Sequence, residues 1–171
     1  MKSFHSVWII TKSDCAIADL ISFEHVTFLY LENSFLYPVG SYVATKIIGK
    51  MLFISGQISI SDNGELIKGK VGKELTTEDG YEAAKRCGLN IISQVKKACD
   101  DDLSKIKSCI KLTGFVNSSK DFIEQPKVIN GASDLIVAVF GDAGMHTRAA
   151  VSANSLPLGV SVEVDAIFEL N

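Results

Sequence analysis

The sequence lacks the features that would tie it to a membrane, a metal site or an oxidising compartment. No apolar run in its 171 residues approaches the roughly 18 needed to cross a bilayer. The four cysteines form no Cys-x-x-Cys pair, so we expect reduced thiols in a cytosol-like compartment. The three histidines show neither His-x-His nor His-Glu-x-x-His spacing, and no Gly-x-Ser-x-Gly turn is present. We therefore predict no bound metal and no serine-hydrolase triad.

Positive charge is also in short supply. With 17 Lys plus Arg against 20 Asp plus Glu, the net charge is −3, which disfavours nucleic acid as a partner. A hydrophobic fraction of 47% with 22% charged residues is typical of a globular protein. A chain of this size buries about 70% of its unfolded surface, enough for one core.

The first 30 residues differ in character from the rest, and we assign them as an N-terminal extension of unknown role before a domain at residues 31–171. Only four consecutive apolar residues, 7–10, precede Lys12, which is too short for a secretory signal. The first acidic residue is Asp14, so organelle targeting by residues 1–30 stays open. We otherwise predict a cytoplasmic location.

Apolar periodicity and turn residues predict seven elements in the order β-β-α-β-α-β-β. They span residues 43–48, 51–58, 76–100, 105–117, 127–141, 148–153 and 160–170. Alternation in the third strand places Ile110 on the same face as Leu112. The order predicts an α+β domain with a mixed sheet and two helices packed on one face. The second face of such a sheet needs covering, so we expect self-association.

Residues 64–71 match the phosphate-binding pattern Gly-x-x-x-x-Gly-Lys up to the last position, where Val71 replaces Ser or Thr. A helix should follow at once, but Gly72 comes before any capping residue. We therefore favour an exposed turn that carries a lysine.

Arginine is scarce, because the chain has only Arg86 and Arg148. Arg148 opens a predicted strand after a glycine-rich loop, where its planar guanidinium could hold a carboxylate or phosphate by two hydrogen bonds. A hairpin at residues 156–159 would bring Glu163 of the last strand back toward it. One arginine and one carboxylate are a minimal set for binding a small acid and orienting water. The alternative is an edge-strand arginine paired with a structural carboxylate.

Five short segments follow one another in a fixed order from residue 37. They read Tyr-Pro-Val-Gly-Ser-Tyr at 37–42, Leu-Phe-Ile-Ser-Gly-Gln at 52–57, Gly-Met-His-Thr-Arg-Ala-Ala-Val at 144–151, Leu-Pro-Leu-Gly at 156–159 and Val-Glu-Val at 162–164. Together they resemble the Rid/YjgF family, also named L-PSP endoribonuclease. Residues 115–117 and 125–134 resemble a longer branch of that family whose function is poorly defined.

The resemblance implies a chorismate-mutase-like α+β fold, assembled as a homotrimer with clefts between subunits. The best-understood members hydrolyse enamines and imines to 2-keto acids and ammonia without a cofactor. By resemblance, Arg148 grips the substrate carboxylate and Glu163 positions water. Three residues would line the cleft: Tyr42, Ser55 and Asn130. The deaminase branch usually has cysteine two positions after the arginine. This chain has Ala150 there, whose backbone could still contact substrate.

Two other functions stay open. One is a non-catalytic trimer that binds small carboxylates in the same cleft, which Ala150 favours. The other is an endoribonuclease or translation inhibitor, which rests on the older family label and is disfavoured by the net charge. The partners we expect are a small carboxylate-bearing substrate and further copies of the chain, without nucleic acid, membrane, metal or cofactor.

Overall fold

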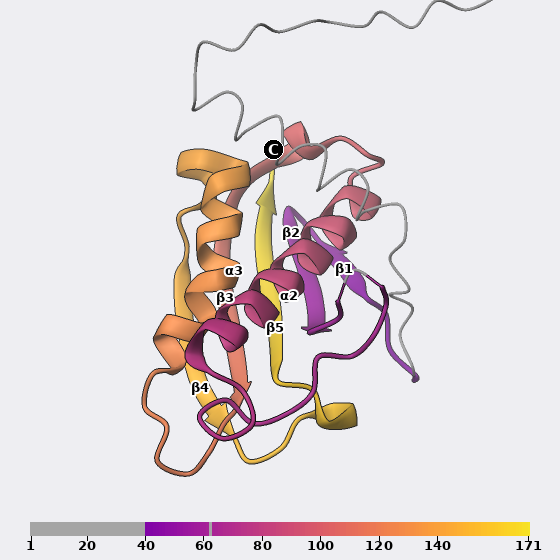
Figure 1. Ribbon diagram of the computed structural model, residues 1–171. Helices are drawn as coiled ribbons and strands as arrows, with labels where there is room; N and C mark the ends of the chain where they lie inside the picture. Colours follow the sequence, from indigo (N-terminus) through magenta and orange to yellow (C-terminus); the bar gives the residue numbers. More distant parts are fainter. Residues whose placement is uncertain (1–39, 62) are drawn as a thin grey trace, which may run out of the picture.

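The computed structural model describes residues 40–61 and 63–171, so the predicted extension at residues 1–30 lies outside the described part. One five-stranded sheet organises the chain (Figure 1), and the strands stand in the order β1-β2-β5-β3-β4. Only β3 and β4 run parallel, so the sheet is mixed. The strands are β1 (Thr45–Ile48), β2 (Met51–Ile58), β3 (Ile106–Asn117), β4 (Thr147–Ala153) and β5 (Val162–Leu170).

Two helices, α2 (Thr77–Ala98) and α3 (Gln125–Phe140), lie on the same side of this sheet in Figure 1. Three short 3-10 turns complete the described elements: η1 (Leu103–Lys105), η2 (Gly141–Gly144) and η3 (Pro157–Gly159). The α+β class, the mixed sheet and the order of elements are therefore confirmed. None of the helices in the described ranges is long and apolar enough to span a membrane.

Local sequence explains where α2 begins. The Thr76 side chain accepts a hydrogen bond from the backbone N–H of Asp79, and the Asp79 carboxylate accepts one from the backbone N–H of Thr76. This reciprocal capping box satisfies two N–H groups that the first helical turn leaves open. Cys87, Ile91 and Val95, which recur at steps of four along α2, are fully buried.

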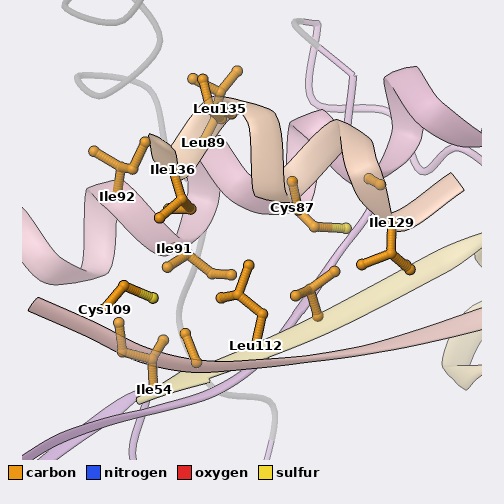
Figure 2. Close-up of a cluster of buried hydrophobic side chains, with 14 of the residues drawn as sticks. Ile54, Cys87, Leu89, Ile91, Ile92, Cys109, Leu112, Ile129, Leu135 and Ile136 are labelled. Atoms are coloured by element: carbon orange, nitrogen blue, oxygen red, sulfur yellow. The ribbon is translucent and has the colours of Figure 1, made fainter. Parts of the chain in front are cut away.

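The core fills the space between the two helices and the sheet (Figure 2). Ile91 of α2, Ile129 and Ile136 of α3 and Leu112 of β3 all belong to this buried cluster. The helices approach closely at Gly131, because a Cβ there would stand 2.0 Å from the carbonyl oxygen of Tyr81. This close packing fixes the position of α3 relative to α2 and the sheet.

The alternation predicted for β3 is wrong at Ile110. The pairing of β3 with β5 shifts register between Ile106 and Ser108 and again between Cys109 and Lys111. Each bulge adds one residue and turns the following side chains to the other face. Cys109 is therefore buried at 2% exposure, whereas Ile110 is 36% exposed.

The predicted return of Glu163 toward Arg148 through a hairpin at 156–159 is also wrong. β4 pairs in parallel with β3, and β5 pairs with the other edge of β3, so β3 lies between β4 and β5. The turn η3 carries the chain across the end of β3. The helices α3 and η2 join β3 to β4, because two parallel strands need a long crossover connection. β4 and β5 are not neighbours in the sheet, so they form no hairpin.

The segment at 64–71 does not form a phosphate-binding loop. It runs into bridges between Lys68 and Val160 and between Val71 and Leu75, and α2 begins only at Thr77. The Lys70 ammonium is half-buried and donates hydrogen bonds to the Asn117 side-chain oxygen, at 2.9 Å, and to the Asn154 carbonyl oxygen. Lys70 therefore ties this loop to the ends of β3 and β4.

Candidate functional site

Arg148 stands at the start of β4, on the side of the sheet that carries the helices. It pairs with Leu112, a core residue, so their side chains share that face. The guanidinium reaches α3, where Nη1 donates to Asn130 Oδ1 at 2.8 Å and to Ser133 Oγ at 3.0 Å, and Nη2 donates to the Pro126 carbonyl at 3.3 Å. The structure thus brings together Arg148 and Asn130, two of the predicted site residues.

These three bonds hold the guanidinium without neutralising it. Arginine has five N–H donors, so two remain without an acceptor among residues 40–61 and 63–171. In the same ranges no carboxylate forms an ion pair with Arg148, whose side chain is exposed. Two free donors on a planar fork are what a carboxylate needs for bidentate binding. The alternative of a structural ion pair is therefore not what the described part shows.

An open groove of about 600 Å³ lies beside the guanidinium. It is lined from α3, from the loop before β4 and from β4 itself, by Ser133, Asp134, Val137, Ala138, Met145, His146 and Arg148. A groove of this size has room for a small organic acid.

Ser133 and His146 are site residues that the sequence analysis missed. Ser133 Oγ lies 3.0 Å from His146 Nε2, and His146 Nδ1 lies 2.7 Å from the Gly144 carbonyl oxygen. A sequence signal for Ser133 did exist, because it follows Asn130 by three positions in a helix and so shares its face. His146 had no such signal, since its contact with Ser133 depends on how η2 returns the chain to the sheet.

Glu163 lies on the opposite face of the sheet. Its neighbours Val162 and Val164 point into the core, so Glu163 points away from the helices. The carboxylate lies against the backbone of Gly56, where a Cβ would stand 1.9 Å from Glu163 Oε1. Burial, and then the nearby charge of Asp165, raise the pKa of Glu163. The carboxylate has no hydrogen-bond partner in the described part of the chain, which leaves its oxygens available to water.

Ser55 and the segment that carries Tyr42 are linked to each other beside Gly56. Ser55 sits in a bulge of β2 between Ile54 and Gln57, next to Gly56, and its hydroxyl donates to the Val43 carbonyl oxygen at 2.8 Å. Tyr42, the residue before Val43, is 56% exposed. Gly56 thus leaves room for the Glu163 carboxylate, and the hydrogen bond between Ser55 and Val43 joins β2 to the segment that carries Tyr42.

Ala150 lies apart from both groups. It follows Arg148 by two positions on β4, pairs with Gly114 and packs its side chain against the hydrophobic core. A methyl group in this position contributes to packing, and it does not line the groove beside Arg148.

The two groups are too far apart in one chain to touch the same small molecule. Arg148 pairs with Leu112 and Glu163 pairs with Phe115, so they stand two strands apart and three residues apart along β3. At roughly 4.8 Å per strand and 3.3 Å per residue, their Cα atoms are about 14 Å apart. Their side chains also point to opposite faces. We name these groups the arginine half-site (Arg148, Asn130, Ser133 and His146) and the glutamate half-site (Glu163, Ser55 and Tyr42).

Comparison with known proteins gives this arrangement a family. The family model described as YjgF/chorismate mutase-like endoribonuclease matches residues 30–170. Protein TCP17 of Trypanosoma cruzi is 46% identical over 135 residues, which cover 78% of this chain and 84% of TCP17. A candidate endoribonuclease of Shewanella oneidensis, known from its crystal structure, is 35% identical with a TM-score of 0.80, covering 88% of this chain and 98% of its own.

One more distant relative has a named activity. The 2-iminobutanoate/2-iminopropanoate deaminase of Rattus norvegicus is 25% identical over 130 residues, which cover 75% of this chain and 80% of the rat protein. The family match covers most of the chain and includes every element of the sheet. The chain therefore belongs to the YjgF/chorismate mutase-like endoribonuclease family.

Proposed function

We propose that this protein is a homotrimer that hydrolyses enamine or imine intermediates to 2-keto acids and ammonia, without a cofactor, in clefts between subunits. The observation that carries the proposal is how the Arg148 guanidinium is held and what it leaves free. Its guanidinium is held by three uncharged acceptors, keeps two N–H donors free and borders an open groove. A group prepared in this way binds a small carboxylate, the feature that 2-imino acids and 2-keto acids share.

The reaction requires few protein groups. A 2-imino acid is anionic at its carboxylate and electrophilic at its imine carbon, so Arg148 would anchor the first and a positioned water would attack the second. Glu163 would orient this water and accept its proton as the carbon–oxygen bond forms. Glu163 would return this proton to the nitrogen. A second proton then passes from the new hydroxyl group to the nitrogen as the carbon–oxygen double bond forms, and the carbon–nitrogen bond breaks to release ammonia. A raised pKa makes the Glu163 carboxylate a stronger base than an ordinary glutamate, which suits this step.

A second copy of the chain would complete the site. In one chain the arginine and glutamate half-sites lie on opposite faces of the sheet, so a small substrate in contact with both requires two chains. The face that carries Glu163 also exposes apolar side chains, with Phe53 at 39% and Val151 at 45% exposure. Covering this face with neighbouring copies would bury these side chains and bring Glu163 of one copy toward Arg148 of another.

The rat imine deaminase supports the reaction class, since it is a relative whose name states this activity. The position of Ala150 favours a second candidate, a trimer that binds small carboxylates without turnover, because its side chain packs into the core and adds no reactive group. Under that alternative, calorimetry would detect binding of a 2-keto acid by the arginine half-site, and no hydrolysis would accompany it.

The test adds purified protein to a threonine or serine dehydratase reaction and measures ammonia and keto-acid release. We expect faster release with the wild type, and no gain over buffer with Arg148→Ala. Arg86→Ala is the matched control, because it removes the other arginine, on α2, and should leave the gain intact. A full gain with Arg148→Ala would overturn the proposal. A native mass of about 56 kDa, three chains of 18.5 kDa, is expected in solution.

A further inference from the structure

A continuous chain of hydrogen bonds leads from the guanidinium into the loop before β4. Arg148 Nη1 donates to Ser133 Oγ at 3.0 Å, Ser133 Oγ lies 3.0 Å from His146 Nε2, and His146 Nδ1 lies 2.7 Å from the Gly144 carbonyl oxygen. Gly144 is fixed in turn, because a Cβ there would stand 2.5 Å from the Ile136 carbonyl oxygen of α3. The imidazole is therefore held at both nitrogens.

The direction of this chain follows from which atoms can donate. A carbonyl oxygen only accepts, so His146 Nδ1 carries a proton and donates to Gly144. In the neutral imidazole Nε2 is then an acceptor, and the Ser133 hydroxyl donates to it while accepting from Arg148. When Nε2 is protonated, it donates to Ser133 Oγ instead, and the Ser133 hydroxyl keeps its proton but turns its O–H toward the groove.

We propose that Ser133 and His146 form a proton-linked part of the anion site, so that a small carboxylate binding at Arg148 is coupled to proton uptake at His146 Nε2. The proton comes from solvent and no covalent bond of the ligand changes. The bound carboxylate then accepts hydrogen bonds from two N–H groups of Arg148 and from the O–H of Ser133. The His146 imidazolium lies directly behind Ser133. The choice of ligand class rests on the proposed function, whereas the link between His146 and Arg148 does not.

The charges around His146 give the sign of the coupling. Two contacts of 3.0 Å place Nε2 within about 6 Å of Nη1, so in the empty site the imidazolium and the guanidinium repel each other. A bound carboxylate removes this opposition and favours the protonated ring. Asp134 of α3 lines the same groove and accepts a hydrogen bond from the Tyr81 hydroxyl of α2. Asp142 of η2 and Lys111 of β3, which pairs with Thr147, are further charged groups on the elements next to His146.

The first measurement needs no ligand. The pH titration of the His146 ring signals is followed by NMR in the wild type, in Arg148→Gln and in the control Arg86→Gln. Removing the guanidinium charge, which lies within about 6 Å of His146 Nε2, should displace this midpoint. Arg86→Gln should leave it in place. An unchanged midpoint in Arg148→Gln would overturn the link.

The second measurement uses pyruvate as the probe in calorimetry at pH 5.5 and pH 8, in buffers of different ionisation enthalpy. The wild type should take up protons on binding and lose at least about threefold in affinity at the higher pH. His146→Gln keeps an amide near the Nε2 position but cannot titrate, so its affinity should be independent of pH. Glu163→Gln, which alters the other half-site, should keep the wild-type proton uptake.

The outcomes separate the two proposals. Proton uptake that persists in His146→Gln and disappears in Glu163→Gln would assign the linkage to Glu163 and overturn this inference. If pyruvate fails to bind while the midpoint still responds to Arg148→Gln, the carboxylate ligand of the proposed function is wrong and the link between His146 and Arg148 stands. Pyruvate binding with equal affinity at both pH values would overturn the inference and leave the proposed function intact.

Discussion

Mixing two inactive variants tests whether the site is built from two chains. Under the proposed function, Arg148→Ala removes the anchor of the arginine half-site and Glu163→Gln removes the base of the glutamate half-site, so the trimer formed by either variant alone should be inactive. In one chain these residues lie on opposite faces of the sheet, about 14 Å apart. In a mixed trimer, some clefts combine an intact Arg148 from one variant with an intact Glu163 from the other.

The size of the recovery follows from the geometry. With equal amounts of the two variants and random assembly, about one quarter of all clefts carry both intact residues, so about one quarter of wild-type activity should return. The recovered activity should be lower when either variant is in excess. The two variants would be co-expressed with the same tag, purified together without selection for mixed trimers, and assayed for ammonia release. Activity that stays at the level of the separate variants would refute a cleft shared between chains.

Three further predictions concern stability and local packing. Gly56→Ala places a Cβ 1.9 Å from Glu163 Oε1, so it should displace the carboxylate and lower turnover by about tenfold or more, while circular dichroism shows an unchanged fold. Glu163→Gln should raise the free energy of unfolding at pH 7, because burial raises the pKa of Glu163 and the folded state therefore disfavours its charged form. This gain should vanish in urea titrations below the ordinary pKa of glutamate, where the wild-type carboxyl is protonated in both states, and a gain that persists there would contradict the reasoning. Gly131→Ala should destabilise the protein by about 3 kcal/mol, since its Cβ would meet the Tyr81 carbonyl oxygen at 2.0 Å, and a midpoint within experimental error of the wild type would show that α2 and α3 can move apart.

Much of the fold could be predicted because its signals are local. The capping box of Thr76 and Asp79 and the apolar stripe of α2 depend on residues within a few positions of one another, so the start and the buried face of this helix follow from local sequence. The order of the strands depends on pairing between distant segments, which the sequence pattern does not encode. The placement of β3 between β4 and β5 and the bulge that buries Cys109 in place of Ile110 both belong to this second class.

The same distinction between local signals and long-range contacts explains which residues of the candidate site could be predicted. Arg148 was recognisable because arginine is rare in this chain and follows a glycine-rich loop, and Asn130 could be assigned by resemblance. Ser133 and His146 meet only because Gly144 packs tightly on α3 and η2 returns the chain to the sheet beside that helix. Glu163 could be singled out from the sequence, but its separation from Arg148 depends on the order of the strands in the sheet. A single chain therefore presents an anchor without a base on one face and a base without an anchor on the other. If both residues act on one small substrate, then the active site forms only when the chains assemble, and assembly contributes to catalysis as well as to stability.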